Sequence, residues 1–117
     1  MPVLKTIGTV IIWIIGILLL LSSVAKFIQP TSVVDAFTTW GLEDYIYLIG
    51  VIELLVAIFL LVPFTRKFGS FLVFAYFGGA IVTHLIAREI TNAVFLVVFL
   101  IVFTIVLFFV YPRMIRR

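Results

Sequence analysis

Four long apolar stretches, separated by short polar segments, dominate this 117-residue chain. They run over about residues 7–25, 45–62, 68–87 and 93–111, and each is close to the roughly 20 apolar residues that a helix needs to cross a bilayer. Charged residues make up 11% of the chain, whereas soluble domains carry about 25%. Because a chain this short cannot bury so much apolar surface in water, we predict a single transmembrane domain over residues 1–117.

The predicted fold class is all-α, an integral membrane four-helix bundle. In hydrocarbon, backbone groups must be paired within a helix or within a closed barrel, and the chain is too short for a full barrel. Pro63 and Pro112 follow the second and fourth apolar stretches. Proline lacks the N–H that would continue a helix, so we expect these two helices to stop there.

The segment between the first two stretches predicts a short interfacial helix over about residues 31–40. Pro30 and Ser32 are typical of a helix start, Asp35 suits the first turn, and Gly41 suits the end. One face is apolar because hydrophobic side chains recur at helical spacing, namely Val33, Val34, Phe37 and Trp40. An ordinary structured loop is the alternative.

Lysine and arginine residues indicate the orientation, since cytoplasmic loops carry an excess of both. With four spans, two basic residues lie on one side, Lys26 and Arg88. Six lie on the other side: Lys5, Arg66, Lys67, Arg113, Arg116 and Arg117. We therefore expect both termini in the cytoplasm, and the protein to be integral to the cytoplasmic (inner) membrane.

A secretory signal peptide is the alternative interpretation of the first stretch. Ser23-Val24-Ala25 loosely matches a small-residue cleavage site, and Lys5 precedes the apolar run. The run is longer than the usual apolar region of a signal peptide, so we expect it to be retained as a span.

Ionisable residues inside a membrane are costly and mark functional sites, and three lie in or at the ends of the stretches: Lys26, Glu53 and His84. Glu53 lies roughly 13 Å inside the second stretch at 1.5 Å per residue. Gly50 and Ala57 share its helix face, and such small residues let neighbouring helices approach. We expect Glu53 to face the bundle, either in a ligand- or proton-linked role or as a protonated acid that hydrogen-bonds a neighbouring helix.

His84 lies near the outer end of the third stretch, on a face of mostly small residues that includes Tyr76, Gly79, Ala80, Thr83 and Ala87. Histidine titrates near neutral pH, so it can shuttle protons or contact a polar ligand head. The alternative is a histidine whose hydrogen bonds are satisfied at the interface. One histidine and one glutamate are too few ligands for a metal site, and none is predicted.

Lys26 ends the first stretch, and Ser22 and Ser23 lie one turn before it. Such a lysine usually extends to the interface. An ion pair with Glu53, or with an anionic group of a ligand, is the alternative.

Depth brings these side chains together. The first and third stretches run outward and the second runs inward, so Lys26 and His84 share the outer leaflet with Glu53 somewhat deeper. We therefore predict an outward-facing polar pocket with Glu53 at its floor and Thr39 and Trp40 at its roof. The full set of predicted ligand-binding residues is Lys26, Glu53, His84, Ser22, Ser23, Tyr76, Thr83 and Trp40.

Several function classes are not supported by the sequence. The absence of cysteine excludes disulfides and thiol redox chemistry. The net charge of +3 lies at the chain ends and in one loop rather than on a shared face, so nucleic acid is not an expected partner. No phosphate loop, nucleophile–histidine arrangement or haem-ligand pair is present, so no catalytic residue is predicted and an independent enzyme is the weakest hypothesis.

Five blocks, in this order and spacing, resemble the DoxX-like family of small four-span membrane proteins. They are Ser22-Ser-Val-Ala-Lys26-Phe, Gly50-Val-Ile-Glu53-Leu-Leu-Val-Ala, Leu60-Leu-Val-Pro63, Arg66-Lys-Phe-Gly69 and Tyr76-Phe-Gly-Gly-Ala80-Ile-Val-Thr-His84-Leu. The resemblance covers roughly residues 7–110. It implies an accessory role in membrane redox systems, such as thiosulfate:quinone oxidoreduction, or a role beside oxidative-stress proteins. Relatives that act on thiols use cysteines, which this chain lacks.

Together these observations predict a binding or accessory component of a membrane redox system, holding a small quinone- or lipid-like ligand in the outward-facing pocket. Quinone is the one candidate cofactor. Membrane lipid, subunits of a redox complex and further copies of the chain are the expected classes of partner. The alternatives are a small oligomeric transporter or proton-linked channel, and a purely structural subunit that docks a larger complex.

Overall fold

The computed structural model describes residues 2–111, and within that range every regular element is helical. The elements are α1 (Pro2–Ile28), α2 (Thr31–Trp40), the short 3₁₀ helix η1 (Glu43–Tyr45), α3 (Ile46–Leu61), a second 3₁₀ helix η2 (Pro63–Thr65), α4 (Arg66–Ile86) and α5 (Ile90–Val110). The four segments containing α1, α3, α4 and α5 are long and apolar enough to cross a membrane. The predicted all-α four-span architecture is confirmed, and α1 is longer at both ends than the sequence suggested.

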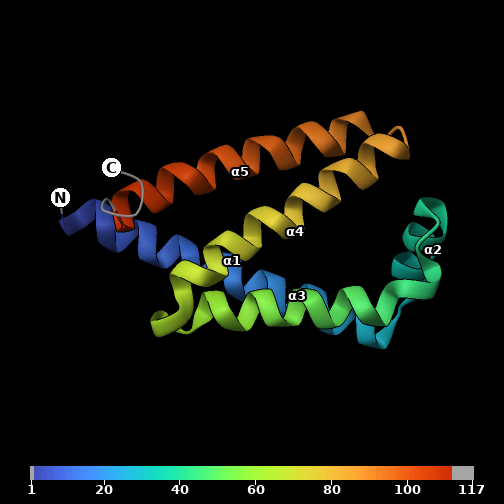
Figure 1. The fold of residues 1–117 in the computed structure, drawn as a ribbon, viewed down its shortest axis with the longest axis horizontal. Coiled ribbons are helices and arrows are strands. Elements are labelled where there is room, and N and C mark those ends of the chain that lie inside the picture. Colours follow the sequence, from blue (N-terminus) through green and yellow to red (C-terminus); the bar gives the residue numbers. More distant parts are fainter. Residues whose placement is uncertain (1, 112–117) are drawn as a thin grey trace.

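The four long helices form a closed ring (Figure 1). Helix α1 packs on α3, α3 on α4, α4 on α5, and α5 returns to α1. The start of α1 touches the end of α5, since a Cβ added to Gly8 would lie 2.6 Å from Cγ2 of Val110. Helix α2 lies at the opposite end of the bundle (Figure 1).

Helix boundaries follow the backbone rules that the sequence indicated. Val62 is extended, with φ −78° and ψ 117°, because the residue before a proline avoids the helical region, and α3 therefore ends at Leu61. Gly41 ends α2 in the left-handed region at φ 75°, which glycine adopts without strain. Pro112, Arg113, Arg116 and Arg117 lie outside the described residues.

Arg66 joins α3 to α4. Its Nε donates to the carbonyl of Leu60 at 2.9 Å and its Nη2 to that of Leu61 at 3.1 Å. These are carbonyls of the last turn of α3, which have no partner within the helix and attract a positive charge. The guanidinium also lies 5.2 Å from the ring centroid of Trp13 on α1, so this nearly buried arginine connects three helices.

The packed core lies mainly in the half of the bundle that contains the start of α1 and the end of α5. Its buried members are Ile12, Leu19, Val56, Ala57, Leu60, Val73, Phe103, Val106, Leu107 and Val110. The buried residues nearest α2, Phe37, Ile46 and Ala93, do not belong to this cluster. The cavity described below lies on that side, and Val56 belongs to both the core and the cavity wall.

Gly69→Ala tests the contact between α3 and α4. A Cβ at this position would lie 2.5 Å from the backbone nitrogen of Leu60 and 2.6 Å from the carbonyl carbon of Phe59. Because backbone cannot move aside as a side chain can, we expect a loss of about 1–3 kcal/mol in the free energy of unfolding. Chemical denaturation in detergent micelles measures it.

Gly78→Ala is the matched control, since a Cβ there meets nothing within 4 Å. Alanine should stabilise that position by about 0.5–1 kcal/mol because it restricts the unfolded chain and favours the helix. Equal effects of the two substitutions would contradict the close α3–α4 contact.

Candidate functional site

A cavity of about 560 Å³ lies in the half of the bundle that the core leaves open. Every long helix and α2 contribute to its wall, which is mostly apolar. The lining residues are Ser22, Lys26, Phe37, Trp40, Leu42, Ile49, Ile52, Glu53, Val56, Leu72, Ala75, Tyr76, Phe77, Gly79, Ala80, Thr83, His84 and Leu96. A volume of this size, apolar with a few polar groups, is typical of small-molecule sites.

An ion pair between Lys26 and Glu53 forms the polar part of the wall. Nζ of Lys26 on α1 lies 2.6 Å from Oε1 of Glu53 on α3, and it also donates to the hydroxyl of Ser22 at 3.0 Å. The two side chains are only 11% and 4% exposed. Of the arrangements that the sequence left open for Lys26, the structure has the ion pair.

Glycine makes this pairing possible. A Cβ added to Gly50 would lie 3.1 Å from Cβ of Lys26, so α1 and α3 approach closely one turn before Glu53. Tyr76 on α4 also interacts with the Glu53 carboxylate. Three helices therefore meet at one carboxylate. Removing one partner of such a buried pair typically lowers the free energy of unfolding by about 3–5 kcal/mol, because the other charge stays buried.

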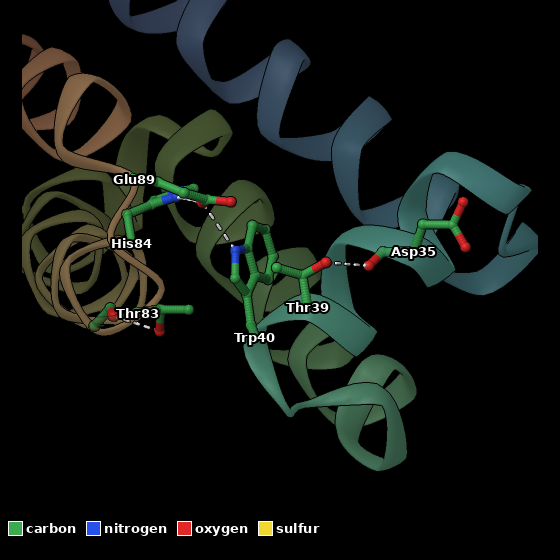
Figure 2. A network of polar contacts seen from close by, with 7 residues as sticks. Asp35, Thr39, Trp40, Thr83, His84 and Glu89 are labelled. Atoms are coloured by element: carbon green, nitrogen blue, oxygen red, sulfur yellow. Dashed lines mark hydrogen bonds and ion pairs between the residues drawn. The ribbon is translucent and has the colours of Figure 1, made fainter.

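A second polar cluster holds α2 against the α4–α5 turn (Figure 2). The indole N–H of Trp40 donates to Oε1 of Glu89 at 3.0 Å, and Nδ1 of His84 lies 2.6 Å from the same oxygen. The rings of Trp40 and His84 also meet edge to face with centroids 5.1 Å apart. Figure 2 shows Trp40 extending from α2 toward Glu89, so one carboxylate joins α2 to α4.

Glu89 is positioned by a turn that reverses the chain. Arg88 adopts the left-handed region at φ 64°, and the backbone N–H of Glu89 donates to the carbonyl of His84 at 2.8 Å. The Trp40 indole N–H, and then His84, hold the pKa of the Glu89 carboxyl below its usual range. An ionised carboxylate only accepts hydrogen bonds, so Nδ1 of His84 carries the shared proton.

Seven of the eight predicted site residues line the cavity: Ser22, Lys26, Trp40, Glu53, Tyr76, Thr83 and His84. Ser23 does not line it. That side chain is fully buried, and its hydroxyl donates to the carbonyl of Leu20 at 2.8 Å. Thr39, expected in the roof, is also outside the lining, and its hydroxyl donates to the Asp35 carbonyl at 3.0 Å (Figure 2).

Sequence reasoning missed Glu89 and gave no role to most of the apolar wall. Glu89 lies in a loop, and only a chain reversal after His84 brings it back to that ring, which helical spacing does not predict. Phe37 could have been found, because it precedes Trp40 by three residues and so shares its helix face. The small residues Gly79 and Ala80 were noted on the His84 face, whereas the large aliphatic wall residues resemble the rest of the apolar stretches.

Glu89→Ala should loosen α2 without disturbing the four long helices. Removing the carboxylate breaks the hydrogen bond from Trp40, so backbone amides of 33–40 should exchange with solvent faster, as hydrogen–deuterium exchange measures. Glu43→Ala, at an exposed position in η1, is the matched control and should leave these amides unchanged. Slow exchange in both variants would show that Glu89 does not hold α2.

The same experiment has a defined pH dependence. The pKa of Glu89 is lowered by its contact with Trp40 and His84, so the contact is fully present above the ordinary glutamate pKa. It is lost only as the pH falls through the lowered value. Exchange over 33–40 should therefore stay constant, after correction for the intrinsic rate, from neutral to mildly acidic pH and rise only in stronger acid.

Comparison with known proteins agrees with this architecture. The DoxX-like family matches residues 4–106, which include α3, α4, the cavity-lining residues and most of α1 and α5. No curated protein and no solved structure matches the chain. A family match over most of the sequence, on a four-span helical membrane bundle, establishes that the chain belongs to the DoxX-like family.

Proposed function

We propose that this protein binds a small amphipathic molecule, quinone- or lipid-like, in the cavity and serves as a binding or accessory component of a membrane redox system. The observation that carries the proposal is the cavity itself. It is a largely apolar space of about 560 Å³ with one compact polar cluster on its wall. Such a site suits a molecule with an apolar body and a single polar head.

The polar cluster offers hydrogen bonds to such a head. Lys26 has three N–H donors and uses two of them, on Glu53 and on Ser22. Its third donor, on the cavity wall, is suited to a carbonyl oxygen of a quinone or an ester. The surrounding wall is aliphatic and aromatic, and suits a ring or a tail.

Small residues on α4 keep the cavity open. Gly79, Ala75 and Ala80 line it, and a Cβ added to Gly79 meets nothing within 4 Å. No neighbouring helix therefore packs so closely against Gly79 that a larger side chain would be excluded. Space that no neighbouring side chain fills, on the wall of an apolar cavity, supports the presence of a ligand.

Gly79→Leu should abolish binding by filling the cavity. A short-chain benzoquinone is titrated into the protein in lipid nanodiscs, and quenching of Trp40 emission reports binding in a Trp13→Phe background. We expect the affinity to fall by at least about tenfold, equivalent to 1.4 kcal/mol. Helix stability should not fall, because leucine is a better helix former than glycine.

Gly78→Leu is the control for this experiment. Gly78 adjoins Gly79 on α4, a Cβ there also meets nothing within 4 Å, but Gly78 does not line the cavity. Quinone binding should therefore match that of the parent protein. Unsaturable quenching in the parent, or equal binding by the Gly79→Leu variant, would refute the proposal.

The orientation is proposed with the function: the cavity end faces outward and both termini face the cytoplasm. Support comes from the basic residues, since Lys5, Arg66 and Lys67 lie at the end of the bundle opposite the cavity. The cavity would then open toward the outer leaflet.

The orientation can be tested by single-cysteine labelling, because the chain has no cysteine of its own. Phe64, 96% exposed in η2, and Glu43, exposed in η1, mark the two ends. In intact cells, a membrane-impermeant maleimide should label the Glu43→Cys variant, and it should label Phe64→Cys only after permeabilisation. The reverse pattern would invert the proposed orientation.

A further inference from the structure

The charges on the cavity wall compensate one another. Lys26 and Glu53 form an ion pair on the wall, with Nζ and Oε1 2.6 Å apart. Both side chains are almost fully buried, so solvent cannot supply a counter-ion at this point. The pair therefore acts toward a ligand as a neutral but strongly dipolar unit.

The other polar side chains on the wall already have partners within the chain. The Trp40 indole N–H and Nδ1 of His84 are held by Glu89. The Thr83 hydroxyl donates to the Gly79 carbonyl at 2.9 Å. What remains beside the ion pair is the third N–H of Lys26, a donor without an unbalanced charge, since the Tyr76 hydroxyl is engaged with Glu53.

We propose that the site selects neutral amphiphiles whose head is a hydrogen-bond acceptor, such as a ketone or quinone carbonyl, and rejects permanently charged heads of either sign. This inference rests on the proposed function and specifies its class of ligand. A charged head would leave water for a low-dielectric cavity that offers no free counter-charge. The free energy of this transfer is strongly unfavourable. A carbonyl accepts from the third N–H of Lys26 and leaves the ion pair intact.

Three single-chain probes of equal tail length test the selection: a methyl ketone, a sulfonate and a quaternary ammonium. Each is titrated into the nanodisc-embedded protein with Trp40 as the reporter, and the Gly79→Leu variant measures signal that does not come from the cavity. We expect saturable binding of the ketone, and binding of both charged probes at least about tenfold weaker.

Two variants make the charge argument specific. Glu53→Gln leaves Lys26 uncompensated, so the sulfonate should now bind more tightly than the ketone. The double variant Lys26→Gln, Glu53→Gln restores neutrality and should restore the preference for the ketone. If Glu53→Gln does not fold, the ranking in the parent protein and in the double variant still decides the question.

The outcomes distinguish the selection of neutral heads from the ligand-binding function itself. Either charged probe binding the parent protein as tightly as the ketone would overturn the selection of neutral heads and leave a ligand-binding cavity in place. An unchanged ranking in the folded Glu53→Gln variant would also overturn it. If no probe gives a saturable signal that Gly79→Leu removes, the ligand-binding function itself fails.

Discussion

The ion pair between Lys26 and Glu53 is the interaction on which the open half of the bundle depends. Toward the chain ends, α1 and α3 are held by an apolar core and by the Arg66 cap. Toward α2 the cavity replaces much of that core, and the 2.6 Å contact between the two charges joins the helices there together with the close approach of Gly50 to Lys26. Neither charge is tolerable alone in this environment, so each residue requires the other.

Three features shape the cavity: an ion pair on one wall, small residues on the opposite wall, and a short helix over the end. The ion pair fixes the α1–α3 wall, and the small residues of α4 leave space opposite it. Helix α2 covers the end, and Glu89 secures it through Trp40 and His84. Helix α2 is flanked by Gln29 and Gly41, both in the left-handed region. The partly exposed Glu89 carboxylate adds a polar contact that joins α2 to α4.

The parts of this structure that lipid dictates were predictable, and the parts set by the packing of one helix on another were not. The spans followed from apolar length alone, and Val62-Pro63 and Gly41 marked real helix ends. Alternating helix direction predicted Glu53 only somewhat deeper than Lys26 and His84, near enough for the contact with Lys26. Whether Lys26 would pair with Glu53 or extend to the interface depended on how α1 is rotated about its axis relative to α3. The hydrophobic periodicity of a single sequence does not give this rotation. The sequence indicated Arg66 only as a marker of orientation. Its hydrogen bonds to the last carbonyls of α3 depend on the geometry of the α3–α4 turn, which the sequence pattern does not predict.

Membrane surroundings change what such a cavity can recognise. In a soluble protein, burying an apolar ligand body removes it from water and supplies most of the affinity. Lipid tails are already as apolar as the cavity wall, so burying the same body here offers little preference over the bilayer. Discrimination must then come from the few groups that lipid tails cannot imitate, which are hydrogen-bond donors and a fixed dipole. In the proposed site those groups lie together around Lys26, Glu53 and Tyr76, so the contact that joins α1 to α3 is also the part of the wall that would distinguish one amphipathic molecule from another.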